Sequence, residues 1–158
     1  ETSFNLGAGF TYRISDKMSF SADLYKINVH DRVVLSGQIG MQSNENSLIN
    51  QFLNNIDTES AGFFLNAVNT STSGIDLTFN LNKISLGKGH IQSSIAANFS
   101  KTEVMSVNLP DFIEGNDLMD EVFSREDISR LETWRPRQKI LYNITYSTGA
   151  ISTTVGVK

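Results

Sequence analysis

The sequence contains no cysteine in its 158 residues, which excludes disulfide bonds, thiolate metal sites and cysteine nucleophiles. Charge is also scarce, because charged residues make up 19% of the chain against roughly 25% in soluble globular proteins. The net charge is −4, and no cluster of Lys and Arg stands out. Since binding to phosphate backbones needs grouped cations, we expect no nucleic-acid partner.

Long apolar runs are missing as well. No run approaches the 18 or more apolar residues of a membrane-spanning helix, and the N-terminus lacks the features of a signal peptide. The sequence begins with ETSFNL, without an initiator Met, and ends with TTVGVK inside an alternating pattern. We therefore expect this chain to be a fragment of a longer one.

Catalytic motifs are absent from the sequence. His30 and His90 are the only histidines, and neither belongs to a G-x-S-x-G or H-E-x-x-H motif. We expect no enzyme, no cofactor and no metal centre. An enzyme that uses only Asp and Glu, such as a glycosidase, stays open, and its carboxylates would come from loops because the alternating segments carry almost none.

Apolar residues alternate with small polar residues in six segments. Between Phe4 and Ile14 every even position is apolar, which is the two-residue period of a β-strand. We expect strands at about residues 4–14, 18–36, 72–84, 90–105, 138–147 and 150–158. This pattern predicts an all-β fold, an antiparallel up-and-down meander of about six strands. The apolar pattern shifts by one between Leu24 and Tyr25, which predicts a β-bulge there.

The connections between these strands alternate between short and long. Hairpin-sized turns lie at 15–17, 86–89 and 148–149, whereas long loops are expected at about 37–70 and 106–136. In a meander this order puts all tight turns at one end and all long loops at the other, as in outer-membrane barrels. Soluble sandwiches mix loop lengths between both ends.

The composition of the two faces of the expected strands also favours an outer-membrane barrel. The polar face carries mainly Asn, Ser and Thr, which suits a crowded, hydrated lumen. Tyr12, Phe20 and Tyr146 lie close to tight turns, where an aromatic belt would meet lipid headgroups. The alternative is that these three aromatic residues pack in an ordinary soluble core.

Short helices are predicted inside the two long loops. Apolar residues recur at helical spacing from Leu48 to Ile56, after Asn46 and Ser47, either of which could cap a helix. A second helix is expected after Ser124, since Asp127 stands three residues later as in a capping box.

The second loop is also acidic. Residues 111–132 contain eight acidic residues and two arginines. The acidic residues are Asp111, Glu114, Asp117, Asp120, Glu121, Glu126, Asp127 and Glu132. They form either a solvated acidic loop or a Ca²⁺ site, and the ligand spacing of an EF-hand is missing.

Three segments resemble successive parts of a known barrel domain. Asp31 and Arg32 precede apolar residues, an Asn-Ala-x-x-Thr-x-x-x-Gly-x-Asp motif enters a strand, and a Pro stands shortly before a Lys-bearing strand. The motif residues are Asn66, Ala67, Thr70, Gly74 and Asp76, and the last pair is Pro136 and Lys139. In these features the chain is similar to TonB-dependent outer-membrane receptors.

The resemblance implies a barrel of about 22 strands that is plugged by an N-terminal domain. Such receptors take up scarce nutrients, such as iron chelates, haem or cobalamin, with energy relayed by TonB. This chain would then be a C-terminal-side slice of barrel wall in the outer membrane of a Gram-negative bacterium. Its partners would be lipid, the remaining strands and plug, the TonB complex and a small nutrient.

Ligand contacts are expected on the two long loops. Candidate contact residues are Phe63, Phe64, Arg125, Arg130 and Trp134, and the alternative for each is ordinary packing of the loops. Gly74 is expected to permit a bend where the chain enters the membrane. Rival functions are a passive porin or adhesin barrel, and a soluble β-sandwich that binds carbohydrate or carries an enzyme.

Overall fold

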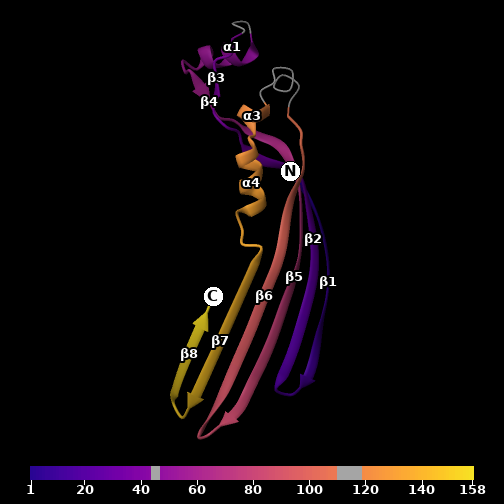
Figure 1. Ribbon diagram of the computed structural model, residues 1–158, viewed down its shortest axis with the longest axis vertical. Helices are drawn as coiled ribbons and strands as arrows, with labels where there is room; N and C mark the ends of the chain where they lie inside the picture. Colours follow the sequence, from indigo (N-terminus) through magenta and orange to yellow (C-terminus); the bar gives the residue numbers. More distant parts are fainter. Residues whose placement is uncertain (44–46, 110–118) are drawn as a thin grey trace. The chain divides into compact units, whose positions relative to one another are not determined.

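The fold of the chain is mostly β-strand, in a computed structural model that describes residues 1–43, 47–109 and 119–158. Six strands form one antiparallel sheet in the order β1-β2-β5-β6-β7-β8, so strands adjacent in this order are hydrogen-bonded neighbours (Figure 1). Their bounds are β1 Thr2–Ser15, β2 Met18–Leu35, β5 Phe64–Leu86, β6 Gly89–Val107, β7 Gln138–Thr148 and β8 Ile151–Val157. The predicted all-β meander is thus confirmed.

One strand boundary differs clearly from the prediction. β5 begins at Phe64, eight residues before the expected start at residue 72, whereas the other ends fall within two residues. Ala67 and Val68 are adjacent in this early part and are both buried. The strand is therefore covered on both faces there, so the alternation that marks a half-exposed strand is absent.

The predicted bulge between Leu24 and Tyr25 is wrong. A Cβ atom on Gly9 would meet the Asp23 carboxylate, and one on Gly74 would meet the Tyr25 ring. Asp23 and Tyr25 hence point to the same face, as residues two apart in a regular strand do. The apolar residues change face at this point, and the backbone keeps its alternation.

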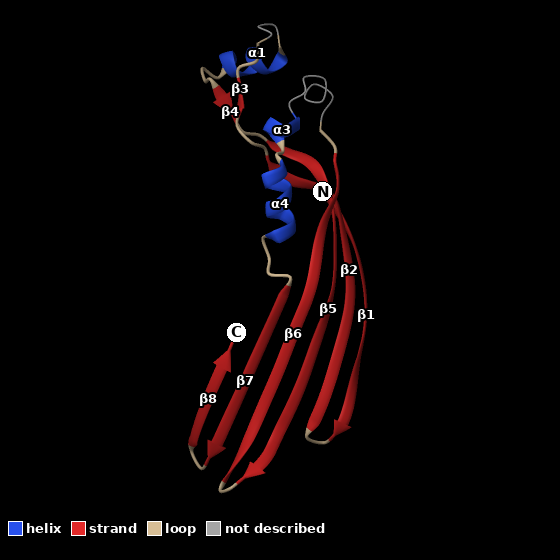
Figure 2. Cartoon of the chain, in the orientation of Figure 1, coloured by secondary structure: helices blue, strands red, loops and turns tan. Residues whose placement is uncertain are grey.

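The chain divides into two compact units, and β2, β5 and β6 contribute residues to both. The first unit comprises Glu1–Phe4, Asn28–Ser71 and Thr102–Trp134. The second comprises Asn5–Ile27, Thr72–Lys101 and Arg135–Lys158. The helices belong to the first unit (Figure 2). Its short elements are β3 Ile39–Gly40, α1 Leu48–Asn55, β4 Ser60–Ala61, α3 Met119–Val122 and α4 Arg125–Thr133.

The first unit has a hydrophobic core of its own. Its buried members are Ile39, Ile49, Leu53, Ala67, Val68, Leu109, Val122 and Phe123. The two-stranded β3–β4 ladder and α1 contribute to this core. The described parts of the two long loops therefore fold into a packed unit.

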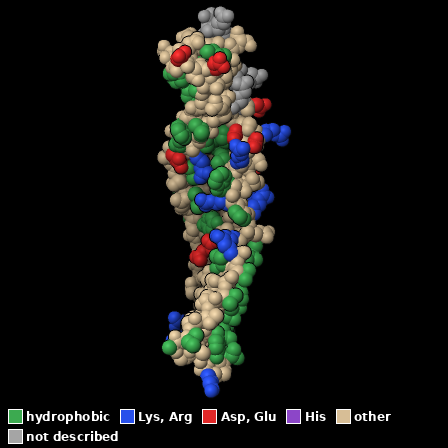
Figure 3. Space-filling view, turned by 90° about the vertical axis from the view of Figure 1, so that its left-hand side faces the viewer, with side chains coloured by type: hydrophobic (Ala, Val, Ile, Leu, Met, Phe, Trp, Pro, Cys, Tyr) green, Lys and Arg blue, Asp and Glu red, His purple; other side chains and the backbone are tan. Residues whose placement is uncertain are grey.

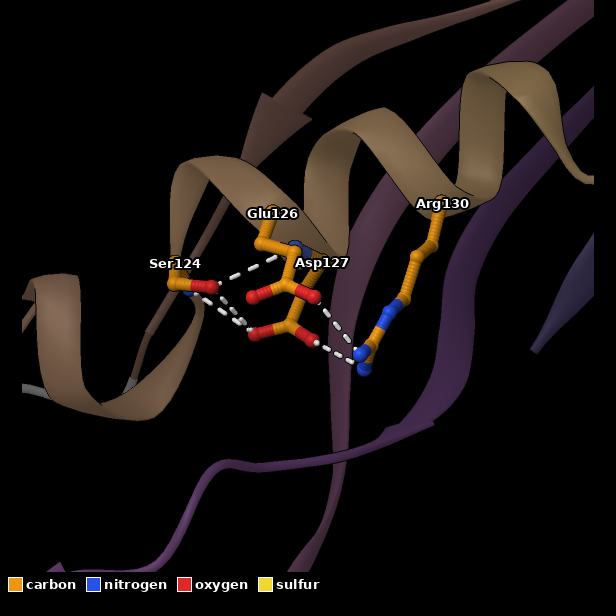
Figure 4. A network of polar contacts seen from close by, with 4 residues as sticks. All are labelled: Ser124, Glu126, Asp127 and Arg130. Atoms are coloured by element: carbon orange, nitrogen blue, oxygen red, sulfur yellow. Dashed lines mark hydrogen bonds and ion pairs between the residues drawn. The ribbon is translucent and has the colours of Figure 1, made fainter.

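Both predicted helices form. The Ser47 hydroxyl accepts a hydrogen bond from the amide of Asn50 at 3.0 Å and caps α1, while Asn46 lies outside the described residues. At α4 the Ser124 hydroxyl accepts from the amide of Asp127, and the Asp127 carboxylate accepts from the amide of Ser124 at 3.0 Å (Figure 4). The expected capping box is confirmed.

The second unit lacks such a core. None of its residues, all of which the structure describes, is buried. Its three tight turns join β1 to β2, β5 to β6 and β7 to β8, and they lie together at the lower end of Figure 1. In the β5–β6 and β7–β8 turns, Gly87 and Gly149 adopt φ values of 60° and 56°, as the first central residue of a type I′ or II′ turn does.

Candidate functional site

The sheet of the second unit presents one apolar face to its surroundings. Register places apolar residues opposite one another: Ile91 faces Tyr146, and Ile95 faces Tyr142 across β6 and β7. Leu24, on β2, is 60% exposed. In the lower part of Figure 3, hydrophobic side chains gather along one side. A contiguous exposed apolar surface of this kind marks a contact with a partner or a membrane.

The apolar face has a definite height. On β6 it runs from Ile91 to Phe99, and on β1 within the second unit from Leu6 to Ile14. The roughly eight steps between nine residues, at about 3.4 Å each, cover roughly 27 Å along a strand. With a tilt of about 40°, that is roughly 20 Å of height, close to the approximately 25 Å apolar band of outer-membrane barrels.

The opposite face carries a ladder of small polar side chains. Thr145 and Thr154 stand opposite each other on β7 and β8, and their hydroxyls are 2.8 Å apart. Ser147 and Ser152 form the next pair, and their hydroxyls are also hydrogen-bonded. These hydroxyl groups satisfy one another across the strands. The polar face is therefore hydrophilic although it carries few charged residues.

A three-residue polar network lies on this face, and sequence reasoning missed it. The amide nitrogen of Asn98 donates to the Asp76 carboxylate at 2.6 Å and to the Tyr25 hydroxyl at 3.1 Å. Gly74 leaves the room that the Tyr25 ring occupies, since a Cβ there would collide with the ring. The only sequence signal was Tyr25 itself, an aromatic residue at a polar position.

The residues of the family-like motif thus have structural roles. Gly74 does not adopt the left-handed conformation, and its missing Cβ leaves room for the Tyr25 ring. The bend expected at this glycine stays a prediction. Ala67 belongs to the core of the first unit, and Thr70 is 2% exposed with a hydroxyl that has no hydrogen-bond partner. Asn66 is exposed, and Asp76 belongs to the polar network.

The remaining motif residues lie at strand ends or on the surface. Asp31 adopts φ 53°, and its amide donates to the side-chain oxygen of Asn69 at 2.9 Å. Arg32 is half-buried, whereas Pro136 and Lys139 are exposed. Lys139 stands opposite Asn98 across β6 and β7, which places it on the polar face.

The two phenylalanine candidates have different environments. Phe63 packs against the core of the first unit, and its ring meets that of Phe52 edge-on at 5.3 Å. Its amide also donates to the Ser36 hydroxyl at 2.9 Å. Phe64 is 77% exposed at the start of β5. Phe63 is therefore a packing residue, and Phe64 is available for contact.

The other three candidates lie on or just after α4. Arg130 pairs with Glu126 at 2.7 Å and with Asp127 at 3.6 Å, as Figure 4 shows. Trp134 caps the helix and is 82% exposed. At about 100° per residue, Trp134 shares a helix face with Arg130, four positions earlier, and Arg125 points elsewhere. The helix therefore places two of these three candidate residues, Arg130 and Trp134, on the same face.

The predicted aromatic belt can be placed by residue. Tyr12 is 62% exposed, and the ring of Phe20 lies 6.0 Å from that of Phe10. The Tyr146 hydroxyl donates to the carbonyl of Leu86 at 3.4 Å, beside the β5–β6 turn. All three predicted belt residues thus stand near the tight turns.

Neither a metal-ligand cluster nor a membrane-spanning helix is found among the described residues. Among the described residues no group of three His, Asp or Glu could hold a metal ion. Asp111, Glu114 and Asp117 of the acidic loop lie outside these residues. None of the described helices is long and apolar enough to cross a membrane.

Comparison with known proteins adds no relative. No protein-family model, no curated protein and no solved structure matches the chain. The likeness to TonB-dependent receptors therefore stays a prediction, and function has to be argued from the two faces of the sheet and from the first unit.

Proposed function

We propose that this chain forms part of the wall of a TonB-dependent transporter in the outer membrane of a Gram-negative bacterium, with its two long connections on the extracellular side. The observation that carries the proposal is the uncovered apolar face of the second unit. A sheet in water covers such a face with another layer. The second unit supplies no such layer, and its residues include no buried core.

The energetics favour a lipid environment for this face. Large apolar residues on it, such as Leu6, Leu24 and Ile140, are between 56% and 64% exposed. Transfer from water stabilises a fully buried Leu or Ile side chain by about 1.5 to 3 kcal/mol. Lipid would recover much of that free energy on every strand at once.

The polar face and the connections support the same assignment. Hydroxyl pairs such as Thr145 with Thr154 satisfy their hydrogen bonds within the sheet, as suits a hydrated interior close to other protein. The tight turns and the long connections alternate along the chain, which is the arrangement of periplasmic turns and extracellular loops in outer-membrane barrels.

The first unit would supply ligand contacts. Among its described residues, Phe64 and Trp134 are the most exposed large aromatic residues, at 77% and 82%, and Arg125 is exposed at the start of α4. Aromatic rings together with a cation suit a small nutrient that carries both apolar and anionic groups. Phe63 and Arg130 would support these residues through the packing and ion pairs described above.

An arginine placed on either face tests the proposal. Ile95 lies at the middle of the apolar stretch of β6, and Ser94 is its neighbour on the polar face, opposite Asn143. At the midplane of a bilayer a lipid-facing Arg costs about 2 to 4 kcal/mol. In the complete barrel that contains this chain, we expect I95R to destabilise folding into phosphatidylcholine vesicles by that amount, measured by urea titration, and S94R to change it by less than about 1 kcal/mol.

Other outcomes of these experiments would favour the alternative functions. Equal effects of I95R and S94R would contradict a lipid-facing role for the apolar face. A compact monomer that stays in solution without detergent would favour the soluble β-sandwich. Active uptake that depends on TonB separates the transporter from a passive porin or an adhesin barrel.

A further inference from the structure

A polar boundary crosses four neighbouring strands at the same end of the apolar face. Beyond the last apolar residue of each strand, the next position on that face is polar. These positions are Lys26 on β2, Ser73 on β5, Lys101 on β6 and Gln138 on β7. Gln138 stands opposite Phe99, so the boundary steps by two residues between β6 and β7.

An open depression of about 660 Å³ lies at this boundary within the second unit. Its apolar lining includes Leu6, Leu24, Ile75 and Phe99. Its cationic lining comprises Arg137 and the two boundary lysines, Lys26 and Lys101. Apolar walls that end in two lysines match an amphipathic molecule with an acyl chain and an anionic head. We propose that this depression binds a phosphate-bearing lipid of the leaflet on the side of the long connections.

The chemistry of lysine fits this role. A lysine places its aliphatic stem along apolar surface while its ammonium group reaches the aqueous boundary. The ammonium carries three N–H donors, which suits it to the several oxygens of a phosphate group. The acyl chain would lie against Leu24 and Phe99, which stand two residues before Lys26 and Lys101 on the same face of their strands.

The site commits to lipid rather than to free phosphate. Two exposed cations alone attract soluble anions weakly, because water and salt screen them. The apolar lining adds binding only for a ligand that brings a hydrocarbon chain. Soluble glycerol phosphate should therefore fail to displace the lipid.

The expected effect follows from charge near a membrane surface. Each such Lys contributes about 1 kcal/mol to the attraction of anionic lipid, which is about fivefold in affinity. The double variant K26Q/K101Q should therefore bind phosphatidylglycerol roughly 30-fold more weakly at low salt. The control K88Q/K139Q removes two charges from the β5–β6 turn and the polar face and should change affinity by less than about threefold.

The measurement is titration of the protein, purified in neutral detergent, with fluorescent phosphatidylglycerol, with glycerol phosphate as competitor. The proposal is overturned by equal losses in both double variants, by no loss in K26Q/K101Q, or by displacement with glycerol phosphate. It rests on the proposed function, and the two fail separately. If the complete barrel that contains this chain does not fold into phosphatidylcholine vesicles, the membrane assignment fails, whereas normal folding without the lysine effect refutes only the lipid site.

Discussion

Leu53 and Leu48 provide a matched test of whether the first unit is a packed structure rather than a pair of loops. Both leucines lie on α1, and both can be changed to alanine. Leu53 is 0% exposed and belongs to the core, whereas Leu48 is 65% exposed. The two variants therefore remove the same atoms from opposite environments on one helix.

The magnitudes follow from these exposures. Removing about three carbon atoms from a buried site costs roughly 2.4 kcal/mol of transfer free energy, and the void left behind raises the loss for Leu53→Ala to about 2.5 to 5 kcal/mol. Only about a third of the Leu48 side chain is covered, so Leu48→Ala should cost less than about 1 kcal/mol.

Hydrogen exchange measured by mass spectrometry reads both effects locally. In Leu53→Ala, amides of α1 should exchange about 60-fold to several thousand-fold faster, because opening of the unit becomes easier. In Leu48→Ala the increase should stay below about fivefold. Amides of β7 and β8, in the second unit, should be unchanged in both variants. Equal acceleration in the two variants would refute the conclusion that α1 packs on a core.

Two further substitutions test local contacts, and both are read as changes in the free energy of unfolding or of local opening. Gly74→Ala should cost about 1 to 3 kcal/mol, because its Cβ would lie 2.8 Å from the carbonyl of Phe99 and collide with the Tyr25 ring. Gly7→Ala is the control, with its nearest neighbour at 3.5 Å, and a similar loss there would contradict the crowding. Ser124→Ala should cost about 0.5 to 2 kcal/mol by removing the cap of α4. Ser129→Ala should cost less than about 0.5 kcal/mol, and equal exchange rates in α4 would argue against the cap.

Local patterns were enough to predict most of the sheet. A two-residue period reports that one face of a strand meets a different environment from the other, and each strand carries that information by itself. The ends of β1, β6, β7 and β8 were therefore predictable within two residues. The same holds for the cap of α4, since Ser124 and Asp127 are only three residues apart.

Predictions failed where the deciding contact lies far away in the sequence. The start of β5 at Phe64 was missed because the segment around Ala67 is covered on both faces. A strand covered on both faces shows no alternation in its sequence. The bulge assigned next to Tyr25 was wrong for a similar reason. The Tyr25 side chain lies beside Gly74 and accepts a hydrogen bond from Asn98. These two residues lie 49 and 73 positions further along the sequence.

The candidate ligand residues illustrate the same division. The sequence marked Phe63 and Phe64 as equivalent neighbours, and the structure separates them into a packed residue and an exposed one. The structure also places Arg130 in ion pairs with Glu126 and Asp127, which helical spacing alone allowed but did not require.

By itself, the sequence determined which strands form, where the tight turns lie and that each strand of the sheet has one apolar and one polar face. These properties depend on residues a few positions apart, which the chain brings together in any context. Tertiary structure alone decided that the long connections pack around Leu53 and Val68, that Gly74 makes room for Tyr25, and that the apolar face of the second unit stays uncovered. Those outcomes depend on contacts between segments that are distant in the sequence. Such contacts form, and stabilise the fold, only once the strands have paired.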